Sequence, residues 1–218
     1  PLSLGIETYG GTVSKIILRN SKIPTLAKEV FTTHVDGQRN VLIHVLQGER
    51  ELAQDCRSLA RFNLVGLPPW PAGLPKIEVT FLVDANGILR VKAKELATGQ
   101  ETEVDVKPTY GLTDEEVEKM LSDSIDFAEK DMSDRQLIDT RVQAEGVLRS
   151  ADKIMREAKN YFTNGKSRED ITRGLQEMEG QMVRIHNLIT GQDFIAIKEA
   201  VSVLETLSKP IAAEVMNV

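Results

Sequence analysis

The sequence predicts an antiparallel β-sandwich followed by a helical appendage. Two observations lead to this fold class: residues 1–111 contain short β-rich segments separated by turn signals, whereas residues 112–218 show helical periodicity. A parallel sheet needs crossover helices between its strands, and the first half shows no helical pattern, so its strands are expected to be antiparallel. We therefore expect two domains, over residues 1–111 and 112–218.

The strand prediction rests on β-branched residues and on alternation. In residues 101–107, Glu101, Glu103 and Asp105 alternate with apolar or β-branched residues, as in a strand with one buried face. Turn signals such as Asn86-Gly87 separate the segments at short intervals, a spacing typical of a sandwich or barrel. The expected strands cover residues 14–18, 41–47, 77–83, 88–93 and 101–107.

After Gly111 the hydrophobic period changes to that of helices. Thr113 with Glu116 predicts a capping box that begins the first helix. A long amphipathic pattern follows, and two further helices are expected over residues 168–190 and 194–207. Consecutive helices with short connections predict a small bundle at the end of the chain.

Composition excludes several classes of function. The net charge of −6 argues against nucleic acid as a partner, and no apolar run reaches the roughly 18 residues that a membrane helix needs. The one cysteine, Cys56, cannot form an internal disulfide, which suits a reducing compartment.

Chemical motifs are scarce. His34, His44 and His186 lie far apart in the sequence, and none has a second ligand at metal-binding spacing. No glycine-rich loop joins a strand to a helix, and no nucleophile stands beside a base in a known pattern. The residues alone therefore favour a binding or structural module over an enzyme. An oligomerisation scaffold stays open as the alternative, and paired helices would then mediate self-association.

Several segments resemble the substrate-binding part of the seventy-kilodalton heat-shock chaperones, the DnaK family. The resemblance is carried by residues 1–8 (PLSLGIET), 43–50 (IHVLQGER), 75–81 (PKIEVTF), 84–89 and 111–113. It implies an antiparallel β-sandwich that binds extended apolar peptides, followed by an α-helical lid ending in a small helical bundle. It therefore implies a peptide-binding subdomain over residues 1–111 and a lid subdomain over residues 112–218.

The resemblance also implies positions for the functional residues. The peptide site would be formed by Ile6, Thr8, Tyr9, Phe31, His34, Val41, Ile43, Val45 and Ile77, with Tyr9 and His34 as an arch over the peptide. The lid would be latched through Asp36, Glu145 and Arg149, with Asp36 pairing with Arg149. Contacts to a nucleotide domain would come from Arg19, Pro24, Asp84 and Asn86. No residue is expected to be catalytic or to bind a metal.

Other segments resemble the HscA branch of this family, which serves iron–sulfur cluster assembly. They are residues 54–62 (QDCRSLARF), 71–73 (PAG) and 106–113 (VKPTYGLT). The branch implies a client segment containing Leu-Pro-Pro in an iron–sulfur scaffold protein, a J-domain co-chaperone as partner, and a cytoplasmic location. A general folding chaperone is the alternative. We expect no cofactor and no enzymatic activity in this fragment, with ATP and Mg²⁺ bound by a nucleotide-binding domain outside it.

Overall fold

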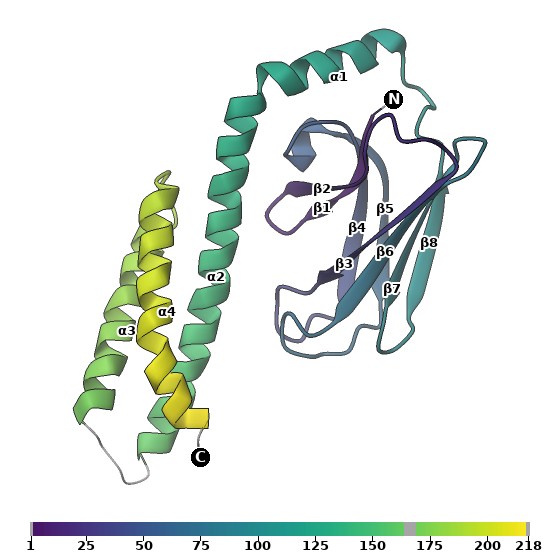
Figure 1. Cartoon of the computed structure of the whole chain (residues 1–218). Coiled ribbons are helices and arrows are strands. Elements are labelled where there is room, and N and C mark those ends of the chain that lie inside the picture. The colour runs from purple at the N-terminus through teal and green to yellow at the C-terminus, as the bar shows by residue number, and fades with distance from the viewer. Residues whose placement is uncertain (1, 164–168, 217–218) are drawn as a thin grey trace. The chain divides into compact units, whose positions relative to one another are not determined.

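The computed structural model describes residues 2–163 and 169–216, and the chain divides into two compact units. Residues 1–135 form the first, here called the β unit, and residues 136–218 form the second, here called the helical unit. In the described residues, eight strands, β1 to β8, are followed by four α-helices, α1 to α4, and Figure 1 labels them.

The β unit contains two four-stranded antiparallel sheets. The first has the order β2-β1-β4-β5, formed by β1 (Leu4–Thr8), β2 (Thr12–Ile17), β4 (Asn40–Gln47) and β5 (Arg57–Val65). The second has the order β3-β6-β7-β8, formed by β3 (Thr25–Thr32), β6 (Lys76–Val83), β7 (Leu89–Glu95) and β8 (Glu101–Val106). All the strand pairs are antiparallel, as the sequence predicted.

Both sheets contribute to one hydrophobic core. In β6, Ile77, Val79, Phe81 and Val83 are buried while the residues between them are more exposed, which is the period of two expected of a strand with one covered face. The core continues through β1, β4 and β7. Side chains from the two sheets therefore exclude water together, and this burial stabilises the pairing of strands that are distant in sequence.

The first helix begins at the predicted cap. The side chain of Thr113 accepts a hydrogen bond from the Glu116 N–H, and the Glu116 carboxylate accepts one from the Thr113 N–H. This reciprocal pair satisfies two backbone donors that a helix start leaves unpaired, and α1 (Asp114–Asp126) follows. The predicted capping box is confirmed.

The helical unit has its own core. It contains most of α2 (Ala128–Thr163), together with α3 (Glu169–Leu188) and α4 (Phe194–Met216). Ala144, Ala151, Ala158 and Ala200 are among the buried residues, and such small side chains let helix axes approach closely. Figure 1 shows α3 and α4 running alongside the lower part of α2. Helix α4 is longer than predicted and contains Pro210.

The predicted fold class, a sandwich followed by a helical lid, is corrected to two antiparallel sheets and four helices divided between two compact units. The units divide inside α2, after Arg135, and not where strands give way to helices. The physical reason is that Asp131 and Arg135 bond to the strand region, whereas the buried face of α2 beyond them packs in the core that it shares with α3 and α4. Helical periodicity reveals that a helix has a buried face, but not which element covers it.

Candidate functional site

The β unit contains an apolar cavity of about 370 Å³. Its lining comes from β1 and the turn after it, from β3 and the loop after it, and from β4 and β6. The lining residues are Ile6, Glu7, Thr8, Tyr9, Gly10, Gly11, Phe31, Thr32, His34, Gln38, Val41, Leu42, Ile43, His44, Ile77 and Val79. The cavity therefore lies where both sheets contribute side chains.

The inner wall of the cavity is apolar. Ile6, Ile43 and Ile77 are almost fully buried, and Phe31 and Val41 are partly buried against the same core. Because these side chains belong to strands with fixed register, the cavity is held open by the sheets themselves.

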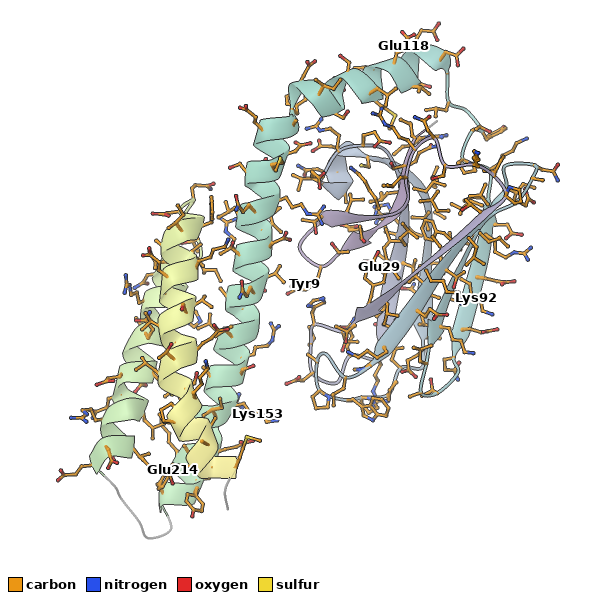
Figure 2. The ribbon with its side chains drawn as sticks, in the orientation of Figure 1. Tyr9, Glu29, Lys92, Glu118, Lys153 and Glu214 are labelled. Atoms are coloured by element: carbon orange, nitrogen blue, oxygen red, sulfur yellow. The ribbon has the colours of Figure 1, made fainter. Side chains whose placement is uncertain are left out.

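Two aromatic rings stand at the rim of the cavity. The rings of Tyr9 and His34 are stacked, with centroids 4.6 Å apart and planes 12° from parallel. Tyr9 follows β1 and precedes Gly10 and Gly11, both of which have positive φ, so this turn uses the freedom that glycine provides. Figure 2 labels Tyr9 at the end of the β1–β2 hairpin. Tyr9 is 44% exposed, so an incoming ligand would meet this pair.

The residues assigned to a peptide site by resemblance lie together, with one exception. All but Val45 line the cavity. Val45 is fully buried in the core of the β unit instead, although it neighbours cavity residues along β4.

The polar neighbours of the cavity form a network that the sequence spacing did not reveal. The buried His44 has its Nδ1 2.7 Å from Glu7 Oε2 and its Nε2 2.8 Å from Ser58 Oγ. Both ring nitrogens therefore have partners, which satisfies a buried imidazole. The three residues are 37 and 14 positions apart in the chain, and only the pairing of strands brings them together.

The residues assigned to a lid latch lie in different units. A carboxylate oxygen of Asp36, in the β unit, accepts a hydrogen bond from the Ala72 N–H at 2.7 Å. Glu145 and Arg149 lie on α2 in the helical unit. The pairing of Asp36 with Arg149 stays a prediction.

The residues assigned to inter-domain contacts lie outside the strands of the β unit. Arg19 follows β2, Pro24 precedes β3, and Asp84 and Asn86 belong to the β6–β7 turn. There, Asp84 Oδ1 accepts hydrogen bonds from the N–H groups of Asn86 and Ile88 at 2.8 and 3.0 Å. Their role in contacts to another domain stays a prediction.

A charged cluster joins the start of α2 to the strands. The guanidinium of Arg50 donates two hydrogen bonds to Asp131, at 2.6 and 2.9 Å, and lies 4.4 Å from the ring centroid of Phe127. The hydrogen bond from Arg50 lowers the pKa of the Asp131 carboxyl, and it does so against the opposing effect of burial. Arg135 adds a hydrogen bond to the Val13 carbonyl oxygen at 2.8 Å.

Glu95, which is buried, and Cys56, which is half-buried, also have shifted pKa values. Burial by itself would raise the pKa of Glu95, but hydrogen bonds from the hydroxyl and N–H of Thr98 and from the Ala97 N–H lower it overall. Burial raises the pKa of the Cys56 thiol to about 11, so this thiol is protonated and a weak nucleophile at neutral pH.

Among the described residues, no group of three His, Cys, Asp or Glu side chains is arranged to hold a metal ion.

The comparisons with known proteins define the class of protein first. The sequence model of the family described as "Hsp70 protein" matches residues 1–217, so the chain belongs to the Hsp70 family of chaperones. Chaperone protein HscA homologs of Tolumonas auensis and Cupriavidus taiwanensis are 45% and 46% identical to it over 217 residues, and the chaperone protein HscA of Klebsiella pneumoniae is 45% identical. Each alignment covers 100% of this chain and 34% of the relative, so the chain spans about a third of the length of these relatives.

These comparisons correct the identification made from the sequence. They establish membership of the Hsp70 family and likeness to HscA chaperones over the whole chain. The narrower identification as a substrate-binding domain, and the function predicted from it, of holding peptides beneath a helical lid, are replaced by this family-level statement. The two-unit structure described above gives a second reason, because the helices are not a single appendage of the sheets.

The expected absence of a cofactor and of enzymatic activity is also withdrawn. That expectation rested on assigning ATP and Mg²⁺ to a domain outside this chain. The family model that matches residues 1–217 describes the Hsp70 protein and does not single out a substrate-binding domain. Within the described part of the chain, no helix is long and apolar enough to cross a membrane.

Proposed function

We propose that the cavity of the β unit binds one large aliphatic side chain of an extended segment in a client protein. The observation that carries the proposal is the convergence of Ile6, Phe31, Val41, Ile43 and Ile77, from four strands in two sheets, on one cavity. Full burial of a leucine side chain contributes about 1.5–3 kcal/mol. The volume of about 370 Å³ is enough for such a side chain together with part of its backbone.

The rim supports selection of an extended backbone. Tyr9 and His34 each carry a ring with polar atoms, so the stacked pair can cover a peptide while offering hydrogen bonds to its main chain. Main-chain hydrogen bonds do not depend on the side chains of the client, and a single apolar anchor then sets the preference. Such a site binds many segments with moderate affinity, as a chaperone requires.

The resemblance of residues 54–62, 71–73 and 106–113 to the HscA branch supports the client class, which is part of the same proposal. The client is an iron–sulfur scaffold protein with a Leu-Pro-Pro segment, and a J-domain co-chaperone and ATP hydrolysis regulate the complete chaperone in the cytoplasm. Proline favours an extended conformation and cannot donate a backbone hydrogen bond. A segment of this kind loses less conformational entropy on binding than a flexible one.

Fluorescence anisotropy with two labelled peptides tests the proposal. One peptide has a Leu-Pro-Pro core followed by Val-Lys, and the other has a leucine-rich core without proline. Val41→Phe fills the cavity, and because it removes the anchor contact we expect it to weaken binding about tenfold to a hundredfold.

Val30→Phe is the matched control, because Val30 is 51% exposed on β3 and does not line the cavity. Preference for the proline peptide supports the iron–sulfur client, and preference for the leucine-rich peptide supports a general chaperone. If neither peptide binds, or if the Val30 and Val41 variants lose the same affinity, the cavity is not the binding site and an oligomerisation module becomes the better interpretation.

A further inference from the structure

Ser58, His44 and Glu7 form a hydrogen-bonded chain across three neighbouring strands of the first sheet. The Ser58 hydroxyl lies 2.8 Å from His44 Nε2, and His44 Nδ1 lies 2.7 Å from Glu7 Oε2. We propose that Ser58 is an activated nucleophile that accepts an acyl group from an activated ester. Glu7 and His44 also line the cavity, whereas Ser58 does not, so acylation of Ser58 can be measured separately from peptide binding.

The order of the three groups is the one that nucleophilic catalysis requires. A carboxylate that accepts the Nδ1 proton fixes the tautomer in which Nε2 is free to accept the hydroxyl proton. His44 is 5% exposed, so its ring cannot turn away from these partners, whereas Ser58 is exposed and open to a reagent. The base and its orienting group are therefore held in place while the nucleophile faces solvent.

An irregularity in the sheet places Ser58 beside the imidazole. In the pairing of β4 with β5, Val45 lies opposite Ala60 but Leu46 lies opposite Ser58, so Leu59 is an extra residue. Ser58 is three positions from Arg61, the partner of His44, so in a regular strand it would point to the opposite face, and the extra residue returns it to the face of His44. A bulge that re-aims one side chain in this way is a recurrent feature beside functional sites.

The same face carries a positive charge. Arg61 is directly opposite His44 in the pairing, and directly opposed residues of antiparallel strands share a face. Its guanidinium can stabilise the negative charge that develops on a carbonyl oxygen during attack.

The proposed step balances without any further reactant. Ser58 Oγ attacks the carbonyl carbon of the ester, its proton moves to His44 Nε2, and the new bond from oxygen to carbon forms. The bond from the carbonyl carbon to the alcohol oxygen then breaks, and the imidazolium returns the proton to the departing alkoxide. Nothing is oxidised or reduced, and Ser58 remains as its ester.

Ser14 provides an internal comparison within the same protein. Its hydroxyl donates to Glu29 Oε2 at 2.7 Å with no imidazole between them. A carboxylate alone is a weak base for a hydroxyl at neutral pH, so Ser14 should react like an ordinary serine. Figure 2 labels Glu29 on β3.

The test treats the whole chain with a fluorophosphonate probe and, separately, with p-nitrophenyl acetate, and locates the adducts by peptide mass spectrometry. We expect Ser58 to be labelled about a hundredfold faster than Ser14, the typical contribution of a positioned base. Ser58→Ala should remove this adduct without changing peptide affinity. His44→Gln should reduce labelling to the rate of Ser14, and Glu7→Gln should reduce it about tenfold.

Circular dichroism and the thermal midpoint of each variant establish whether it is folded. If His44→Gln does not fold, Glu7→Gln decides the question. Labelling of Ser58 no faster than that of Ser14 overturns the proposal, as does a folded His44 or Glu7 variant that reacts at the wild-type rate. Failure of the peptide experiment leaves this result unaffected, because that experiment substitutes Val41 and Val30 and measures affinity, whereas this one measures a covalent adduct on Ser58.

Discussion

The two units of the chain are stabilised in different ways. In the β unit, Ser3, His44, Gln47 and Asp131 are among the buried polar residues, and hydrogen bonds join them to other segments, between 10 and 81 positions away in the sequence. Among the described residues of the helical unit, the only buried polar residue is Thr140, whose hydroxyl donates to the Gln136 carbonyl one turn earlier. The β unit thus depends on polar networks between distant segments, and the helical unit depends on apolar faces.

This difference explains where the two candidate sites lie. A polar group that is buried must be paired, and the pairs fix one arrangement of the backbone. The cavity and the Ser58 network occur only where such pairs hold side chains from several strands at fixed positions. Apolar helix faces stabilise a fold but do not hold polar or reactive side chains at fixed positions.

The largest expected effect comes from shortening one buried side chain in the core of one unit and measuring the unfolding of both units. Phe81 and Leu204 are fully buried, one in each unit, and each change to alanine should cost about 3–5 and 2–5 kcal/mol respectively. Urea unfolding followed by Trp70 fluorescence reports on the β unit, while helical circular dichroism reports mainly on the helical unit. We expect each change to shift its own signal. Equal shifts of both signals in both variants would mean that the chain unfolds as one body.

Removing a buried charge should have the next largest effect. Asp131→Ala leaves the guanidinium of Arg50 without its bidentate partner, and loss of one member of a buried pair costs about 3 kcal/mol. The matched control is Asp134→Ala, which breaks only a surface pair with Lys130 worth about 0–1 kcal/mol. Trp70 fluorescence in urea should separate the two variants; indistinguishable midpoints would show that the cluster does not stabilise the β unit.

Acid should destabilise the β unit selectively. The pKa values of Asp131 and Glu95 are lowered in the folded state by their hydrogen bonds, so their contribution is complete above the ordinary carboxyl pKa of about 4. It is lost as the pH falls below that value and through the lowered folded pKa, because the unfolded chain then binds more protons. We expect the urea midpoint from Trp70 to fall between pH 5 and 3 by more than the helical signal does. In Asp131→Asn this fall should be smaller, and an unchanged fall would exclude Asp131 as its source.

The smallest expected effect on stability comes from replacing one glycine in each unit by alanine. Gly180 is exposed in α3 with nothing within 4 Å of an added Cβ, so Gly180→Ala should stabilise the helical unit by about 1 kcal/mol. At Gly5 in β1, an added Cβ would lie 2.1 Å from the Ser14 carbonyl oxygen, so Gly5→Ala should destabilise the β unit. We expect the thermal midpoint of unfolding to rise in Gly180→Ala and to fall in Gly5→Ala. A stabilised Gly5 variant would mean that the two strands separate easily.

Much of the secondary structure was predictable, and the reasons can be traced to particular residues. The alternation in β8 and the Thr113–Glu116 cap are local patterns, and both are present in the structure. Strands β1, β3 and β5 were not predicted as strands. In β5, the bulge at Leu59 breaks the alternation that would have marked it.

The candidate site was found only in part. Resemblance supplied residues that meet around the cavity, but Val45, on the same face of β4 as Ile43, is fully buried in the core and does not line the cavity. The network of Glu7, His44 and Ser58 had no signal in the spacing, since it depends on the register of three strands and on one bulge.

The sequence by itself determined five of the strands, the cap of the first helix, the change from strands to helices near Gly111, and the segments that resemble Hsp70 chaperones. The tertiary structure alone decided that the compact units divide after Arg135 and that a serine stands beside an imidazole. The physical reason is the range of the interactions. Caps, turns and periodicity act over a few residues and can be read along the chain. Strand register and the partners of buried charges depend on contacts between distant residues, which exist only once both sheets have formed.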